Sequence, residues 1–131
     1  MVTINNMSFK AGKELKISGK AKENTGWHFE IGHNEHDVAL HFNPRFDMHG
    51  DVNTVVCNSK SGDCWQDEQR ESCFPFQPEE DFKIVITFNN EFFYINLGDG
   101  NMIHFPNRFG DDKFRYMHFG GDAKIYSFKI K

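Results

Sequence analysis

Hydrophobic and polar residues alternate along several stretches of the chain with the period of a β-strand. Trp27, Phe29 and Ile31 alternate with His28 and Glu30, and residues 82–88 alternate in the same way. A period of two puts one set of side chains on the buried face of a strand. Turn-forming residues recur roughly every ten positions, which is typical of sandwiches and barrels. The pattern therefore predicts an all-β protein, a sandwich or barrel with Trp27 in its core, and we expect two antiparallel sheets packed face to face.

The second half of the chain contains two turn signals that predict consecutive hairpins. Asn89-Asn90 follows the strand at 82–88 and precedes an aromatic run at 92–97. A second turn at 97–101 leads into a strand at 102–105. β-Branched and aromatic residues favour strands over helices in these segments. We expect no helix longer than one turn.

Polar side chains gather at strand spacing between residues 41 and 70. His41, Asn43 and Arg45 share one face of an extended chain, while the apolar residues at 40, 42 and 46 face the other way. Pro44 cannot donate to a strand ladder, so the strand is expected to be near its end or bulged there, on an outer face of the sandwich. Trp65 follows in the same region. Donors, an amide and a flat indole together suit a ligand rich in hydroxyls with one apolar face, which is a sugar.

Composition limits the remaining possibilities. At 131 residues with 38% hydrophobic content, the chain suits one domain, residues 1–131, with its own core. A net charge of -4 with scattered lysines argues against nucleic acid as a partner. No run of about 18 apolar residues occurs, which argues against insertion into a membrane.

The amino terminus and the cysteines suggest a cytoplasmic origin. Residues 1–6 lack the apolar run of a signal peptide. The three cysteines, Cys57, Cys64 and Cys73, are odd in number and form no C-x-x-C pair, so we expect reduced thiols.

Three ordered elements resemble the carbohydrate-recognition domain of the galectins. They are H-F-N-P-R at 41–45, the pair Asn58-Ser59 and W-x-x-E-x-R at 65–70. Flanking pieces at 49–51, 74–76, 105–108 and 121–122 agree, so the resemblance covers essentially the whole chain. It implies an all-β fold, an antiparallel two-sheet β-sandwich of jelly-roll type. It also implies a carbohydrate site made of polar side chains and one indole: His41, Asn43, Arg45, His49, Asn58, Trp65, Glu68 and Arg70.

The resemblance also implies a role for each part of this site. His41, Asn43 and Arg45 would hold the axial 4-hydroxyl of galactose, with the apolar face of the ring against Trp65. Asn58 and Glu68 would hold the 6-hydroxyl. Arg45, Glu68 and Arg70 would hold the 3-hydroxyl of an adjoining glucose or N-acetylglucosamine. His49 would donate to the sugar or its network, and Asp51 would support the arginines.

The function implied is a metal-independent lectin without cofactors, binding β-galactosides such as lactose and N-acetyllactosamine. Its partners would be glycoproteins and glycolipids, cross-linked by a homodimer formed through the terminal strands, after export from the cytoplasm without a signal peptide. Two alternatives are a cytosolic carrier of small lipids and a structural protein of lectin ancestry that no longer binds sugar.

Two further site types fit the sequence less well. Asp67 and Glu68 are adjacent, so in a strand they face opposite ways and do not flank one bond as a glycosidase requires. The segment 33–37 contains two histidines and three other polar residues without cysteine partners, so a solvated turn is favoured over a metal site.

Overall fold

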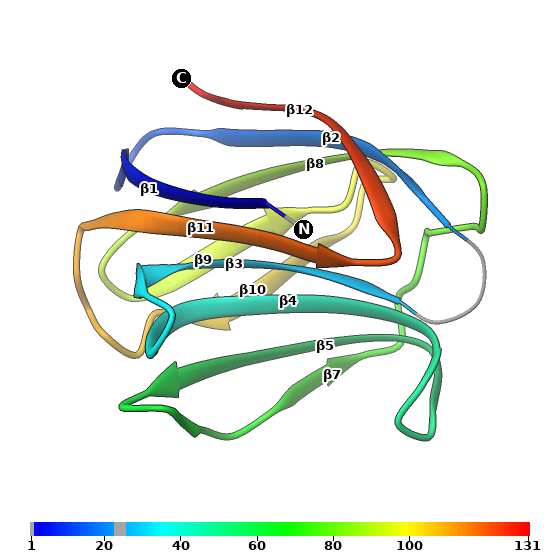
Figure 1. Cartoon of the computed structure of the whole chain (residues 1–131), viewed down its shortest axis with the longest axis horizontal. Coiled ribbons are helices and arrows are strands. Elements are labelled where there is room, and N and C mark those ends of the chain that lie inside the picture. The colour runs from blue at the N-terminus through cyan, green and yellow to red at the C-terminus, as the bar shows by residue number, and fades with distance from the viewer. Residues whose placement is uncertain (1, 23–25) are drawn as a thin grey trace.

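The described part of the chain, residues 2–22 and 26–131 of a computed structural model, folds into twelve β-strands and contains no helix. No helix that could cross a membrane is therefore found in this part. The strands are β1 (Val2–Lys10), β2 (Leu15–Ala21), β3 (Trp27–Asn34), β4 (Asp37–Met48), β5 (Asp51–Ser61), β6 (Cys64–Trp65), β7 (Gln69–Glu71), β8 (Asp81–Phe88), β9 (Phe92–Asn96), β10 (Met102–Pro106), β11 (Lys113–Gly121) and β12 (Ala123–Ile130) (Figure 1).

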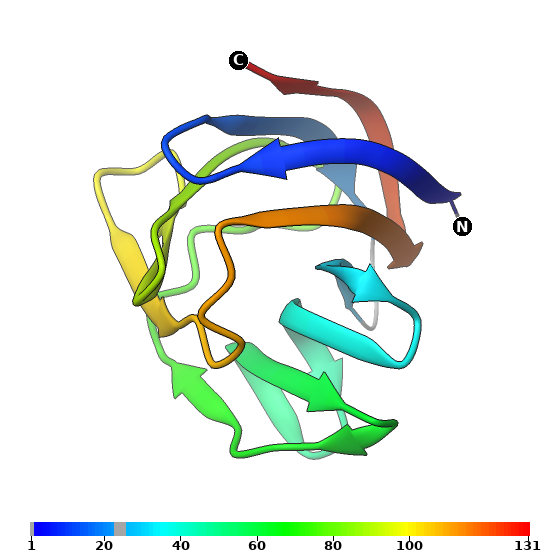
Figure 2. The same ribbon diagram turned by 90° about the vertical axis from the view of Figure 1, so that its left-hand side faces the viewer.

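The strands form two antiparallel sheets packed face to face (Figure 2). The seven-stranded sheet has the order β1-β11-β3-β4-β5-β6, with β7 also paired to β5. The five-stranded sheet has the order β10-β9-β8-β2-β12. The predicted two-sheet sandwich is confirmed, and each sheet buries one face and leaves the other to solvent.

Aromatic rings and branched aliphatic side chains fill the space between the sheets. On β8, Ile84, Ile86 and Phe88 are buried, as their alternation predicted. Trp27 is 1% exposed, and its ring stacks on Phe82 with centroids 4.4 Å apart. The prediction that Trp27 belongs to the core is therefore confirmed. The two predicted hairpins are also present, as β8–β9 and β9–β10.

The expectation that the strand ends or bulges at Pro44 is wrong. β4 runs on to Met48, Pro44 pairs in register with Val55, and the irregularity of this ladder lies between Val38 and His41. On the other side, the register of β3 against β4 brings Trp27 opposite Pro44. Pro44 has no N–H to donate, and the Asn43 amide donates to the Trp27 carbonyl instead, at 2.7 Å. A neighbouring side chain thus allows proline inside a paired strand.

The edge strands β1 and β12 lie at the same end of the sandwich, in both views (Figures 1 and 2). β1 ends the seven-stranded sheet and β12 ends the five-stranded one. Val2 on β1 and Tyr126 on β12 are each 50% exposed. A hollow of about 300 Å³ lies between these strands, lined mainly by apolar side chains. This end of the molecule therefore presents apolar surface from both sheets.

Candidate functional site

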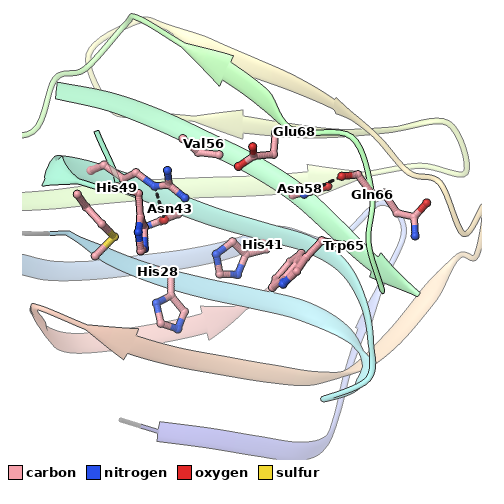
Figure 3. A pocket seen from close by; sticks show the side chains of 11 residues that line it. His28, His41, Asn43, His49, Val56, Asn58, Trp65, Gln66 and Glu68 are labelled. Atoms are coloured by element: carbon pink, nitrogen blue, oxygen red, sulfur yellow. Dashed lines mark hydrogen bonds between the residues drawn. The ribbon is translucent and has the colours of Figure 1, made fainter. Parts of the chain in front are cut away.

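A hollow of about 600 Å³ lies on the outer face of the seven-stranded sheet, over β3 to β6 (Figure 3). It opens to solvent, away from the core. Its lining consists of polar side chains, one indole and two apolar residues: His28, His41, Asn43, Arg45, Met48, His49, Val56, Asn58, Trp65, Gln66 and Glu68. Seven of the eight side chains expected from the sequence lie together here, and Arg70 lies beside the hollow, joined to Glu68 and Asp51.

His41 projects from β4 with its orientation set by the neighbouring strand. Glu30, directly opposite on β3, accepts a hydrogen bond from Nδ1 of His41 at 2.7 Å. Burial opposes ionisation of Glu30, but its hydrogen bond and charge interaction with His41 outweigh this and lower the Glu30 pKa. The other ring nitrogen of His41, Nε2, is left for a hydroxyl of a ligand.

Asp51 is the centre of the charged network along the hollow. Nη1 of Arg45 donates to Asp51 at 2.7 Å, and Nε and Nη2 of Arg70 donate to the same carboxylate at 3.2 and 3.3 Å. Arg70 also donates to Glu68 at 3.3 Å. The hydrogen bond from Arg70, followed by that from Arg45, lowers the pKa of Asp51. A carboxylate between two guanidinium groups fixes both before a ligand arrives.

Asn43 has a more internal position than its neighbours on β4. It is 5% exposed, its Nδ2 donates to the Trp27 carbonyl, and its Oδ1 accepts from Nε of Arg45 at 2.8 Å. Arg45 thus uses Nε and Nη1 for Asn43 and Asp51, and no described residue accepts from its Nη2. Arg45 therefore keeps a donor for a ligand, as His41 keeps its Nε2.

Trp65 is the exposed aromatic side of the hollow. It is 50% exposed, in contrast to Trp27. Its ring and that of His41 pack edge to face with centroids 4.9 Å apart, and Figure 3 shows the two rings side by side. The Lys60 ammonium lies 4.9 Å from the centre of the indole and supports it by a cation–π contact. An indole held in this way offers an apolar surface to a ligand at the hollow.

His49 enters the hollow from the tight turn between β4 and β5. Met48 pairs with Asp51, so His49 and Gly50 form a two-residue turn with φ values of 52° and 84°. Two positive φ values are characteristic of the type I′ turns that match the twist of a hairpin. Through this turn His49 joins Met48 in the lining of the hollow.

Sequence reasoning missed His28, Met48, Val56 and Gln66 in the lining of the hollow, and Glu30 beneath His41. The alternation of 27–31 did carry a signal for His28 and Glu30, because it placed both on the face opposite Trp27. Which residues lie beside His28 and Glu30 depends on the register between strands, and the alternation along one strand does not specify that register.

His28 sits in a row of stacked imidazoles. Its ring lies 5.2 Å from that of His41 and 5.6 Å from that of His118 on β11. Burial, and secondarily the charge of His41, lower the pKa of His28 to about 4. His28 is therefore a neutral side chain of the hollow at physiological pH.

Metal-binding geometry is not found in the described residues, where no group of three suitable ligands occurs. In the segment 33–37, the first two residues end β3, residues 35 and 36 form the turn and Asp37 begins β4. His36 donates toward Asp63 at 2.7 Å and is largely exposed, and His33 pairs with Asp111 at 2.7 Å. The histidines of this turn thus have separate carboxylate partners.

A β-sandwich with hydroxyl-binding groups and an exposed indole on one outer face defines a carbohydrate-binding lectin. Comparison with known proteins agrees with this class. The family model of galactoside-binding lectins matches residues 1–130. A beta-galactoside-binding lectin of Electrophorus electricus is 53% identical over 95% of this chain and 93% of its own.

Solved structures give the same result. The structure of congerin II with lactose and MES is 32% identical, has a TM-score of 0.95 and matches over 99% of this chain and 98% of its own. CG-16, a homodimeric agglutinin from chicken liver, is 36% identical with a TM-score of 0.94, over 99% and 98% of the two chains. The chain belongs to the family of galactoside-binding lectins, the galectins. Proteins of this family are lectins and not enzymes.

Proposed function

We propose that this protein is a metal-independent lectin for lactose and N-acetyllactosamine that cross-links β-galactoside glycans as a homodimer. The observation that carries the first part is the convergence of His41, Arg45 and Trp65 on one open hollow. A hydroxylated ring with one apolar face would lie against Trp65 while its polar edge meets the β4 row. Glu68 and Arg70 extend this polar surface toward an adjoining sugar.

The axial 4-hydroxyl of galactose supplies the discrimination. It leaves the hydrogens on C3 to C5 as an apolar patch for the indole and directs the hydroxyl toward His41 and Arg45. An equatorial 4-hydroxyl, as in glucose, would leave those groups desolvated without a partner. Each unpaired buried polar group costs about 1 to 3 kcal/mol, or roughly 5- to 150-fold in affinity. Selectivity therefore comes from the polar row and not from the stacking.

The test is calorimetry of lactose binding in the presence of a chelator, with a disaccharide of two glucose units as the comparison. We expect a dissociation constant on the order of 10⁻⁵ to 10⁻³ M for lactose, typical of a shallow site. Loss of binding in chelator, or equal binding of the glucose disaccharide, would contradict the proposal. Absence of any galactoside binding would support the alternative, a structural protein of lectin ancestry.

The carrier alternative fits the structure poorly. A lipid carrier needs an apolar cavity inside its barrel, whereas Phe9, Phe88 and Phe93 pack ring against ring between these sheets. The 600 Å³ hollow lies outside the core and carries charged groups. The family assignment also places the chain among lectins.

Dimerisation through the terminal strands is supported by the apolar end of the sandwich. One hollow per chain cannot bridge two glycans, so cross-linking requires a second copy. Edge strands β1 and β12 meet there, and a two-fold contact would cover Val2 and Tyr126. Ile4 and Phe128 lie deeper and pack against the core, so they would contribute less exposed surface to this contact. The homodimeric chicken agglutinin has a closely similar fold.

Sedimentation equilibrium and agglutination of galactose-bearing cells test the dimer together. The variant Val2→Asp/Tyr126→Asp should sediment as a monomer, lose agglutination and keep its lactose affinity per chain. The matched control is Phe92→Asp/Met102→Asp, because those residues are exposed on β9 and β10, the two strands farthest from β12 in the five-stranded sheet. A Val2→Asp/Tyr126→Asp variant that remains dimeric would place the interface elsewhere, and a monomer that still agglutinates would contradict cross-linking by a dimer.

A further inference from the structure

Arg108 connects the two sheets at the side of the sugar hollow, although it is absent from the lining. It follows β10, a strand of the five-stranded sheet, and its guanidinium reaches across to the seven-stranded sheet. Nη1 donates to Ser59 Oγ at 2.9 Å and to Asn58 Oδ1 at 3.3 Å, and Nη2 donates to the Asp67 carbonyl at 2.8 Å. One side chain thus holds two segments that carry residues of the hollow.

The first consequence concerns the orientation of Asn58. Its Oδ1 accepts from both Arg108 and the backbone N–H of Ser59, at 3.3 and 2.7 Å. An amide whose oxygen has two donors on one side cannot turn over without losing both. Its Nδ2 must then face the other way, where it donates to the Gln66 carbonyl at 3.1 Å and borders the hollow.

The second consequence concerns the segment 66–68 between β6 and β7. This segment has no strand structure, yet it carries Gln66 and Glu68 into the hollow. Its carbonyl groups at 66 and 67 accept from Asn58 and Arg108, and the N–H of Gln66 donates to the Ser59 carbonyl at 2.9 Å. These contacts take the place of a ladder and fix the backbone next to Glu68.

Arg108 is itself held in place. Its guanidinium carbon lies 4.8 Å from the centre of the Phe105 ring, which is completely buried. The preceding residue, Asn107, is buried and donates to the carbonyls of Asn89 and Asp111 at 3.0 and 2.9 Å. The guanidinium of Arg108 is therefore oriented by the hydrogen-bonded loop at Asn107 and by its contact with the Phe105 ring.

We propose that Arg108 is a positioning residue of the sugar site, which orders Asn58 and the segment before Glu68 without touching the ligand. This inference rests on the proposed galactoside-binding function. A planar fork is needed because Ser59 and Asp67 receive donors from different nitrogens of the same group. The ammonium of a lysine, on its flexible side chain, can donate well to one of these acceptors but not to all of them at once.

The experiment measures lactose affinity and thermal unfolding for Arg108→Ala, Arg108→Lys and the control Arg115→Ala. Arg115 is exposed on β11, and its replacement changes the net charge equally. We expect Arg108→Ala to weaken lactose binding at least about fivefold, and Arg108→Lys to recover little of this loss. Arg115→Ala should bind as the parent does. Arg108→Lys also serves if the alanine variant folds poorly.

A double-mutant cycle with Asn58→Ala separates positioning from general stabilisation. If Arg108 acts through Asn58, the loss in the double variant should fall short of the product of the two single losses by about threefold or more. Losses that multiply, full recovery by lysine, or unchanged binding in Arg108→Ala would overturn the inference. If the parent protein itself binds no lactose, the proposed lectin function fails. If the parent binds lactose but the Arg108 variants behave as described in the preceding sentence, only the inference about Arg108 fails.

Discussion

Replacing each tryptophan by alanine separates sugar binding from stability, because the two indoles lie on opposite faces of the seven-stranded sheet. Trp65 is half exposed at the hollow, where a galactose ring would cover it. If stacking removes about 60 Å² of apolar surface from water, the gain is roughly 1.5 kcal/mol. The affinity for lactose should therefore fall about tenfold in Trp65→Ala. Its melting temperature should stay within about 2 °C, because exposed substitutions change stability little.

Trp27→Ala should have the opposite effect. The indole is 1% exposed and packs between Phe82 and Phe76, at 4.4 and 5.8 Å between ring centroids. Deleting a buried aromatic costs about 3 to 5 kcal/mol. For a domain of this size, that corresponds to a fall in melting temperature of about 10 °C or more. The Nε1 donor of Trp27 has no partner among the described residues, so Trp27→Phe should cost clearly less.

Calorimetric titration with lactose and thermal unfolding by circular dichroism give both quantities on the same samples. Trp27→Ala should bind lactose normally below its melting temperature, once corrected for the fraction folded. The reasoning is refuted if Trp65→Ala melts as far below the parent as Trp27→Ala does. It is equally refuted if Trp27→Ala melts like the parent while losing the sugar.

Two further predictions follow from titratable groups and thiols. The pKa of His28 falls from 6.5 to about 4 on folding, so the unfolded chain binds more protons between these values, and stability is complete above pH 6.5 and decreases as the pH falls toward 4. The change corresponds to at most about 3 kcal/mol, reduced by solvent screening at a partly exposed ring to about 1 to 2 kcal/mol. Between pH 7 and 4.5, the melting temperature of His28→Asn should therefore fall less than that of the parent. Equal falls in melting temperature would contradict the role of His28. Cys57 is buried with a raised pKa, whereas Cys64 is exposed next to the hollow, so air should oxidise Cys64 first and thereby impair lactose binding. Cys64→Ser should keep its lactose affinity during aerobic storage. Equal losses of affinity in parent and variant would exclude oxidation of this thiol as the cause.

The faces of individual strands could be predicted from the sequence because burial follows the period of the strand. The alternation around Trp27 and along β8 placed the core correctly, and the row at 41–45 placed its polar side chains on an outer face. Neighbours across strands were not predictable in this way. Glu30 meets His41 only through the register of β3 against β4, and Arg108 reaches Asn58 across 50 residues of chain.

Pro44 shows a different limit of sequence reasoning. The rule that proline interrupts a ladder is sound for a backbone considered alone. In this fold, the missing donor falls opposite the Trp27 carbonyl, and the adjacent Asn43 side chain satisfies that acceptor. The sequence shows that Pro44 lacks a donor, but it does not show that the Asn43 side chain donates instead. That hydrogen bond depends on which residue of β3 lies opposite Pro44.

The side chains of the hollow are ordered by contacts within the protein, and this limits what each can give to a ligand. Asn43 and Asn58 are nearly buried and already hold backbone carbonyls, and Arg45 has committed two of its nitrogens to Asn43 and Asp51. Their ordering entropy is therefore lost on folding and not on binding. Such a site gains few new contacts from a sugar but penalises a misplaced hydroxyl, since its groups cannot turn to new partners. The weak affinity per site and the strict choice of stereochemistry that we propose would then have one cause, and the proposed dimer would add strength by joining two sites.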